Sequence, residues 1–139
     1  RDWTDFNQPE TRAIRDYLLR EVKTDSLRTV YYGIDFHSTD ENIFYPINRS
    51  IDTFPDDFSF ALIDSIQTAF PEVDFAVEPF DTSSPITKNW IFRTFGADAL
   101  TYEVNDDADR EKLRSVAQKA ADAMMRMLLE NDYESTARQ

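Results

Sequence analysis

The sequence predicts a single α/β unit in which one sheet is flanked by helices. Segments with apolar residues at helical spacing alternate with short β-branched and aromatic segments, in the order helix, strand, strand, helix, strand, helix, strand, helix. The length of 139 residues fits one domain. Hydrophobic residues at 41% and aromatic residues at 14% are too many for a disordered acidic chain. We therefore expect one folded unit over residues 1–139, without a linker or an internal repeat.

The first predicted helix begins at Pro9, because the N–H that proline lacks has no partner in the first turn of a helix. Asn7 is a candidate cap just upstream. The helix is expected to end within residues 23–26. Its apolar positions recur at helical spacing and are Ile14, Tyr17, Leu18 and Val22.

Two strands of different character are predicted next. Residues 29–36 are β-branched and aromatic and almost free of charge, which is typical of a strand buried on both faces. The polar residues 37–42 are expected to form a loop. A shorter apolar run at residues 43–45 ends at Pro46, and a further loop is expected over residues 48–55.

The rest of the chain repeats the alternation. The predicted elements are a helix from Asp57 to Pro71, a strand over residues 73–77, an exposed loop over 78–85, a helix over 86–95 ended by Gly96, and a strand over 99–104. Acidic residues within 105–109 favour the start of a last helix, and residues 134–139 are expected to be a frayed tail. The expected buried positions of the last helix are Leu113, Val116, Ala120, Met124, Met127 and Leu128.

Composition excludes several functions. With 27 acidic and 15 basic residues the net charge is −12, which argues against binding nucleic acid or an anionic membrane surface. No apolar run approaches the roughly 18 residues of a membrane span. The chain has no cysteine, which excludes disulfides, thiolate nucleophiles and Cys-ligated zinc. Two glycines, Gly33 and Gly96, are too few for a glycine-rich phosphate loop or a Gly-x-Ser-x-Gly elbow.

The one histidine, His37, directly follows the most apolar predicted strand. Ligands and catalytic groups in open α/β sheets collect at the carboxyl ends of strands. Asp35 and His37 share a face of the strand, whereas Phe36 points to the other face. Both a site histidine and a loop-edge histidine hydrogen-bonded to a neighbouring carboxylate fit this pattern.

Glu103 lies near the end of a strand whose neighbouring residues are apolar. A carboxylate in such a place needs a partner or a purpose, and a general base is one. An exposed edge residue of an acidic protein is the alternative. Because one histidine without cysteine cannot close a zinc site, a metal here would need further ligands from elsewhere.

Four segments carry a family resemblance. They are Asp35-Phe36-His37-Ser38 followed by Tyr45-Pro46, the opening Arg1-Asp2-Trp3, Thr87-Lys88-Asn89-Trp90, and Glu103 at 13 residues beyond Trp90. In their order along the chain, and near their spacings, they resemble the C-terminal half of the catalytic domain of M14 zinc metallocarboxypeptidases, the carboxypeptidase A-like enzymes. The resemblance implies a mixed sheet flanked by helices, as in the C-terminal half of the zinc carboxypeptidase/phosphorylase-hydrolase-like fold. It also implies that residues 1–139 are the C-terminal part of a larger peptidase domain.

The resemblance implies an enzyme that uses zinc to remove the C-terminal residue of a peptide. His37 would ligate zinc, and Glu103 would accept a proton from the attacking water and pass it to the leaving amine. Arg1 would anchor the substrate carboxylate or polarise the scissile carbonyl, and Ser38 would offer backbone contacts. Lys88 stands where members often set side-chain preference, so a C-terminal Glu or Asp is implied. A solvated lysine on a short helix is the alternative.

The chain also departs from the family. The His-x-x-Glu pair that supplies two zinc ligands lies upstream in the family and has no counterpart here, so we expect the chain alone to be inactive. The mobile tyrosine of digestive-type members would fall at about Asp81. Pro85-Ile86 replaces the Gly-Gly that commonly precedes the pocket segment.

Two other functions stay open. One is an amidohydrolase of the succinylglutamate desuccinylase or aspartoacylase type, which acts on small N-acyl amino acids. The other is a non-catalytic α/β interaction domain. The Thr-x-Asn-Trp stretch followed by Glu103 favours the peptidase. The expected partners are a peptide C-terminus, the N-terminal half of the parent domain and, through an exposed sheet edge, a second copy of the chain.

Overall fold

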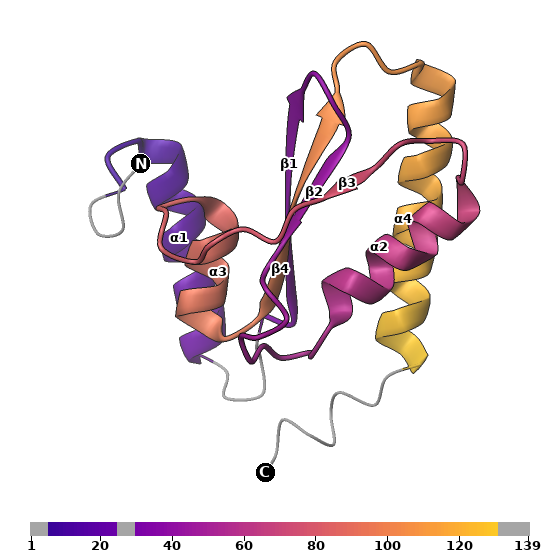
Figure 1. Ribbon diagram of the computed structural model, residues 1–139. Helices are drawn as coiled ribbons and strands as arrows, with labels where there is room; N and C mark the ends of the chain where they lie inside the picture. Colours follow the sequence, from indigo (N-terminus) through magenta and orange to yellow (C-terminus); the bar gives the residue numbers. More distant parts are fainter. Residues whose placement is uncertain (1–5, 25–29, 131–139) are drawn as a thin grey trace.

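The computed structural model describes residues 6–24 and 30–130 and shows three layers (Figure 1). Helices α1 and α3 lie on one side of a four-stranded sheet, and α2 and α4 lie on the other. The elements are α1 (Pro9–Thr24), β1 (Tyr32–Thr39), β2 (Ile43–Pro46), α2 (Phe58–Ala69), β3 (Ala76–Val77), α3 (Thr87–Phe95), β4 (Asp98–Asn105) and α4 (Arg110–Glu130). Their order is the predicted one.

The sheet is mixed, and its strands lie in the order β1-β4-β2-β3. Strands β1 and β4 are parallel, β4 and β2 are antiparallel, and β2 and β3 are parallel. The prediction of an α/β fold with a mixed sheet flanked by helices is therefore confirmed. Among the described residues, β1 pairs only with β4 and so forms one edge of the sheet.

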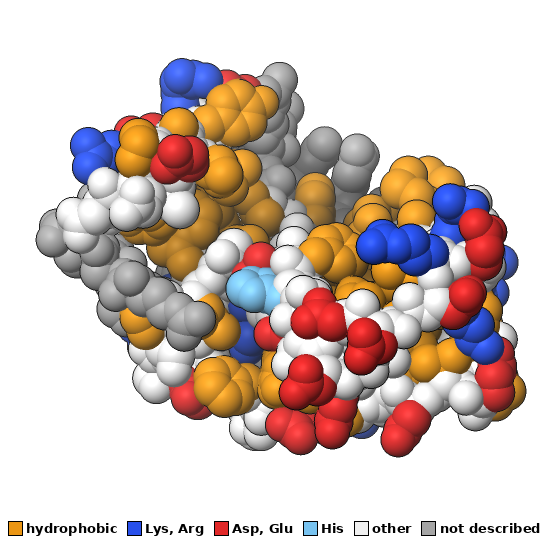
Figure 2. Space-filling model, turned by 90° about the horizontal axis from the view of Figure 1, so that it is seen from above, with side chains coloured by type: hydrophobic (Ala, Val, Ile, Leu, Met, Phe, Trp, Pro, Cys, Tyr) orange, Lys and Arg blue, Asp and Glu red, His pale blue; other side chains and the backbone are white. Residues whose placement is uncertain are grey.

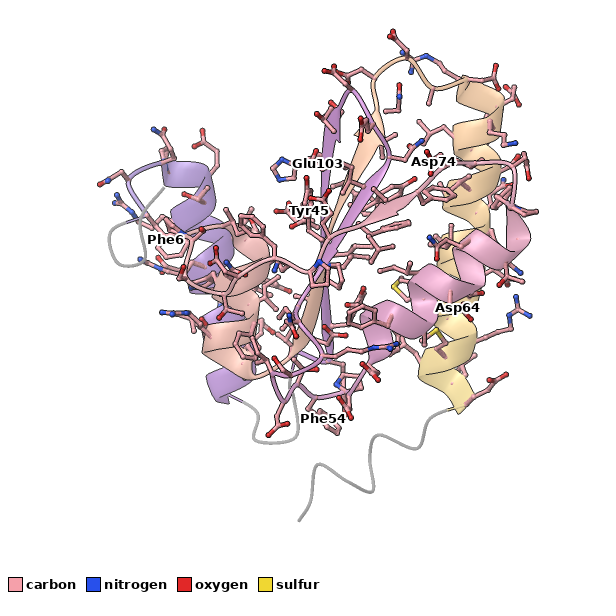
Figure 3. All side chains as sticks on the ribbon, in the orientation of Figure 1. Phe6, Tyr45, Phe54, Asp64, Asp74 and Glu103 are labelled. Atoms are coloured by element: carbon pink, nitrogen blue, oxygen red, sulfur yellow. The ribbon has the colours of Figure 1, made fainter. Side chains whose placement is uncertain are left out.

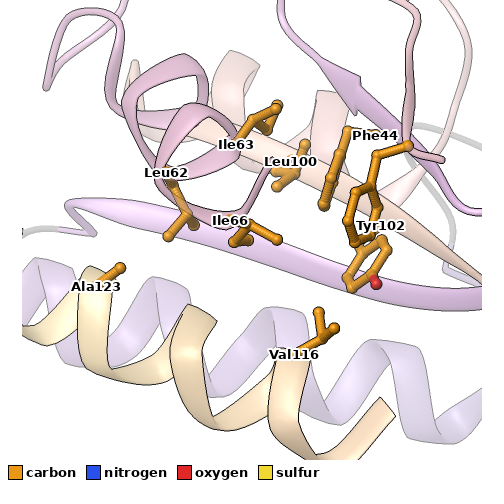
Figure 4. Close-up of a cluster of buried hydrophobic side chains, with 9 residues drawn as sticks. Phe44, Leu62, Ile63, Ile66, Leu100, Tyr102, Val116 and Ala123 are labelled. Carbon is orange, nitrogen blue, oxygen red and sulfur yellow. The ribbon is translucent and has the colours of Figure 1, made fainter. Parts of the chain in front are cut away.

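The main core fills the space between the sheet and helices α2 and α4 (Figure 4). Phe44 of β2 is fully buried, and its ring lies 4.5 Å from that of Tyr102 and 5.3 Å from that of Phe75. The other fully or nearly buried members of this core are Leu62, Ile63, Ile66, Leu100, Val116 and Ala123. A second, smaller buried cluster consists of Ile47, Ile91, Ala97 and Ala99 and includes a residue of α3.

The expected buried side of the last helix is confirmed only in part. Val116 is buried as predicted, but Ala123, which the pattern did not single out, is the second deeply buried position. Ala120, Met124 and Met127 are only partly buried against the core. The small residue Ala123 is buried because α4 packs closely against α2. The longer side chains of α4 lie at the edge of this helix–helix contact.

On the other face, α3 packs directly onto β1 and β4. A Cβ added at Gly33 would lie 2.5 Å from Ile91 Cδ1, so glycine is what allows β1 and α3 to approach this closely. Gly96 has a positive φ of 69°, and its N–H donates to the Phe92 carbonyl at 2.8 Å. This left-handed residue ends α3 where the sequence predicted.

Strand β1 differs from its prediction in two ways. It begins at Tyr32, and it continues through His37 to Thr39, because the whole segment pairs with β4. The polar residues expected to form a loop are therefore partly strand. The strand is also not buried on both faces, because it lies at the sheet edge, where the side chain of Phe36 is 63% exposed.

Two further expectations need correction. Strand β3 is only Ala76–Val77, because only these two residues of the predicted strand pair with β2. The bounds of α1 agree with the prediction, but its apolar side is open: Ile14 is 61% and Tyr17 55% exposed.

No helix among residues 6–24 and 30–130 has the length and apolar character needed to cross a membrane. The predicted tail over residues 134–139 lies outside the described residues.

Candidate active site

His37 and Glu103 lie side by side on the sheet. They are Cα partners in the parallel pair of β1 and β4, so their side chains project from the same face, near the carboxyl ends of both strands. This is the face that carries α1 and α3 (Figures 1 and 3). The structure thus brings together the two residues that the sequence singled out.

The His37 ring is held by Asp35 of the same strand. His37 Nε2 lies 3.1 Å from Asp35 Oδ2, and the two side chains are 48% and 19% exposed. A neutral imidazole that donates from Nε2 keeps Nδ1 as its acceptor. Metal-bound histidines are commonly oriented by such a carboxylate, and a loop-edge histidine paired with a carboxylate has the same bond.

The described residues fit zinc only in part. His37 has a nitrogen available and a carboxylate behind its ring, as a zinc ligand requires. However, residues 6–24 and 30–130 contain no group of three His, Cys, Asp or Glu side chains that could hold a metal ion. This part of the chain offers one imidazole and does not by itself form a zinc site.

Glu103 is not an exposed edge residue, because β4 lies between β1 and β2. Its Oε2 atom is buried and has no hydrogen-bond partner among the described residues. A buried carboxylate oxygen without a partner loses hydration and gains nothing in return. The alternative of an exposed acidic edge residue is therefore wrong.

Lys88 is fully buried on α3, so the alternative of a solvated lysine is wrong as well. Its Nζ has no hydrogen-bond partner in the described part of the chain. Burial lowers the pKa of Lys88 to about 8, while the charges of Asp81 and Asp98 act in the opposite direction. Lys88 is therefore a buried cation without a direct hydrogen-bond partner in the described part of the chain.

A third unpaired polar atom, on Thr101, lies on the same side of the sheet as Glu103. Thr101, two residues before Glu103 on β4, is buried, and its Oγ1 has no partner among the described residues. Thr101 faces α3 because the alternate residues Leu100 and Tyr102 belong to the core on the opposite face. Its distance of two positions from Glu103 was the sequence signal that could have identified it.

Asp81, where the family's mobile tyrosine would fall, holds its own loop together. Its Oδ1 accepts hydrogen bonds from the Ser83 N–H and Oγ, each at 2.6 Å, and from the Ser84 N–H at 3.0 Å. These bonds lower the pKa of Asp81. Asn89 Nδ2 then donates to the Ser84 carbonyl at 2.9 Å, which ties the loop to α3. Asp81 therefore serves the loop.

The other two predicted site residues are less well placed. Ser38 is exposed, and because it is adjacent to His37 on β1 its side chain points to the opposite face. Only its backbone can contribute to a site on the His37 face, which is the role expected of it. Arg1 lies outside the described residues.

A cleft of about 580 Å³ opens beside His37, between α1 and α3. Asp35 and His37 contribute to its lining, together with the apolar residues Phe6, Ile14, Leu18, Ile86, Trp90 and Ile91. In Figure 2 the histidine lies between a hollow with hydrophobic walls and a group of acidic side chains. Glu103 does not line this cleft, so the cleft does not extend over both His37 and Glu103.

Comparison with known proteins gives one family. No curated protein and no solved structure matches the chain. The zinc carboxypeptidase family, peptidase family M14, matches residues 1–139, the whole length of the chain. The match includes both strands that carry His37 and Glu103 and agrees with the helix-flanked mixed sheet. The chain therefore belongs to the zinc carboxypeptidase family.

Proposed function

We propose that this chain carries the catalytic base and one zinc ligand of a metallocarboxypeptidase, an enzyme that removes the C-terminal residue of a peptide. One observation carries the proposal: His37 and Glu103 are Cα partners on adjacent parallel strands, near their carboxyl ends, and project from the same face of the sheet. A metal ligand and a base that project side by side from one face can act on the same substrate bond.

Each residue has a defined task in this proposal. His37 supplies one imidazole ligand, with its ring oriented by Asp35. Zinc, when bound by the complete enzyme, supplies Lewis-acid polarisation of the scissile carbonyl. Glu103 accepts a proton from the attacking water and passes it to the leaving amine. Arg1 binds the terminal carboxylate or polarises the carbonyl, and the Ser38 backbone contacts the peptide.

Lys88 supports a preference for an acidic C-terminal residue. Its buried ammonium on α3 and the buried Thr101 hydroxyl, on the face of the sheet that α3 covers, have no hydrogen-bond partners among the described residues. A Glu or Asp side chain would supply the missing negative charge and the missing hydrogen-bond acceptor. A neutral side chain would leave the ammonium unpaired, which is costly in a buried site.

We further propose that residues 1–139 are one part of a larger catalytic domain and are inactive alone. The described residues provide one imidazole ligand, and β1 presents a free edge with the exposed Phe36. The open apolar side of α1 borders the cleft beside His37. The N-terminal half of the parent domain would pair with β1, fill this cleft and add the other zinc ligands.

The test uses the full-length parent and a set of N-acetylated tripeptides that differ in the C-terminal residue. We expect release of a free C-terminal amino acid, fastest from peptides ending in Glu or Asp. We expect one zinc per parent chain and loss of that zinc in His37→Ala, while Asp35→Asn binds zinc more weakly. Release of acetate from N-acetyl amino acids in place of peptide cleavage would identify a deacylase, and no hydrolysis of either kind an interaction domain.

A further inference from the structure

We propose that Tyr45 is a substrate-positioning residue of this site, whose hydroxyl donates a hydrogen bond to a peptide carbonyl oxygen beside Glu103. The inference rests on the proposed function, because it needs a peptide bound over the His37–Glu103 pair. It concerns the third strand of the site face, β2, which that proposal leaves without a role.

The register places Tyr45 on the site face. In the antiparallel pair of β2 and β4, Ile43 is opposite Glu103 and Tyr45 is opposite Thr101. Tyr45 therefore projects from the same side of the sheet as Glu103 and is its diagonal neighbour. Figure 3 shows both residues on the side of the sheet that faces α1 and α3.

The charges around the phenol favour a neutral acceptor. Burial, followed by the charges of Glu78, Glu103 and Glu41, raises the pKa of Tyr45. The hydroxyl therefore stays protonated and can donate a hydrogen bond at any pH where the carboxylates are charged. The same carboxylates would repel a substrate carboxylate but not an amide carbonyl, which is the acceptor we infer.

The ring of Tyr45 is held in place, but its hydroxyl is free to bind. The Phe80 ring contacts it edge-on, with centroids 5.8 Å apart, and the Phe80 N–H donates to the Pro46 carbonyl at 3.2 Å. These contacts fix the ring between β2 and the loop that follows β3. Within residues 6–24 and 30–130, no side chain or backbone group is hydrogen-bonded to the Tyr45 hydroxyl.

In the loop next to Tyr45, the residue that follows Phe80 is Asp81, which cannot donate a hydrogen bond to a peptide carbonyl in place of Tyr45. Asp81 is an acceptor, and its Oδ1 is taken up by Ser83 and Ser84. On β2 the phenol of Tyr45 is the donor diagonal to Glu103 on this face. A residue fixed on a strand and braced by an aromatic ring positions a substrate more accurately than one on a free loop.

The test compares Tyr45→Phe with Tyr102→Phe and Glu103→Gln in the full-length parent, on the N-acetylated tripeptide that the wild-type protein cleaves fastest. Tyr102 lies on β4 and belongs to the opposite face, so its variant is the matched control for loss of a hydroxyl. Loss of one neutral hydrogen bond should raise KM about 3- to 10-fold in Tyr45→Phe and leave kcat within about twofold. Tyr102→Phe should leave both constants unchanged.

The outcomes separate the inference from the proposed function. An unchanged KM in Tyr45→Phe, with turnover lost in Glu103→Gln, would overturn the role of Tyr45 and leave the peptidase assignment intact. A fall in kcat at constant KM would also overturn it, because Tyr45 would then act in the chemical step. Full turnover in Glu103→Gln would overturn the proposed function and the inference together.

Discussion

His37 and Glu103 are partners across the β1–β4 ladder although they lie 66 positions apart in the sequence. Their pairing depends on the parallel crossover that leads from β1 through β2, α2, β3 and α3 to β4. Asp35 on the same face orients the histidine, and Thr101 lies opposite Asp35. Four polar residues thus form two adjacent rows on a sheet whose other face is core.

Lys88→Met should stabilise the chain near neutral pH. Burial lowers the pKa of Lys88 from 10.5 to about 8, so between these values the unfolded chain holds more protons than the folded chain. The free energy of unfolding of the wild-type chain should therefore rise with pH across this window, by about 2 kcal/mol between about pH 7 and about pH 9.5. Lys88→Met should lose that rise.

Urea unfolding at both pH values checks this prediction, with Lys119→Met on α4 as the matched control. The control variant should keep the pH dependence of the wild-type chain. An equal rise with pH in Lys88→Met and in the wild-type chain would show that another group is responsible.

Asp98→Ala should destabilise the start of α2. Asp57 precedes this helix but makes no side-chain cap, and Asp98 Oδ2 instead accepts a hydrogen bond from the Ser59 N–H at 2.6 Å. Asp98 Oδ1 accepts from the Ala99 N–H at 2.8 Å. Removal of both acceptors in a buried site should cost about 2 kcal/mol of unfolding free energy.

Tyr32→Phe is the comparison for Asp98→Ala. It removes only the hydroxyl that lies 3.2 Å from Ser59 Oγ and should cost about 1 kcal/mol. Both costs can be measured by urea denaturation. If the two variants lost equal stability, Asp98 would not be the main cap of α2.

The isolated chain should self-associate through the free edge of β1. An exposed strand edge with apolar side chains is a template for pairing, and Phe36 is the exposed aromatic residue on this strand. Phe36→Lys should raise the dissociation constant at least about tenfold, because it removes apolar area and adds a charge at the edge.

Sedimentation velocity at micromolar concentration measures this association, with Leu129→Lys as the control. Leu129 is 80% exposed but lies near the end of α4, away from β1. A wild-type chain that sediments strictly as a monomer would contradict the prediction.

Much of the fold could be predicted because its signals are local. Pro9 begins α1, Gly96 ends α3 in the left-handed conformation, and the alternation of element types gives the order of the elements. His37 and Glu103 could be selected because a histidine or carboxylate next to an apolar strand is unusual. Local patterns are enough for such decisions.

The rest depends on pairing between distant segments. The extension of β1 through polar residues follows from its ladder with β4, and the role of Tyr45 follows from the register of β2. The burial of Lys88 depends on how α3 packs onto the sheet, and Asp98 caps a helix that begins 40 positions earlier, at Phe58. Sequence spacing alone contains none of these relationships.

Turnover by Glu103→Gln in the full-length parent tests the central claim most directly. Glutamine keeps the size of the side chain but cannot accept the proton, so kcat for release of the C-terminal residue should fall by about 10²- to 10⁴-fold, with zinc content unchanged. Turnover equal to that of the wild-type enzyme, at equal zinc content, would contradict the assignment of Glu103 as the base of a carboxypeptidase.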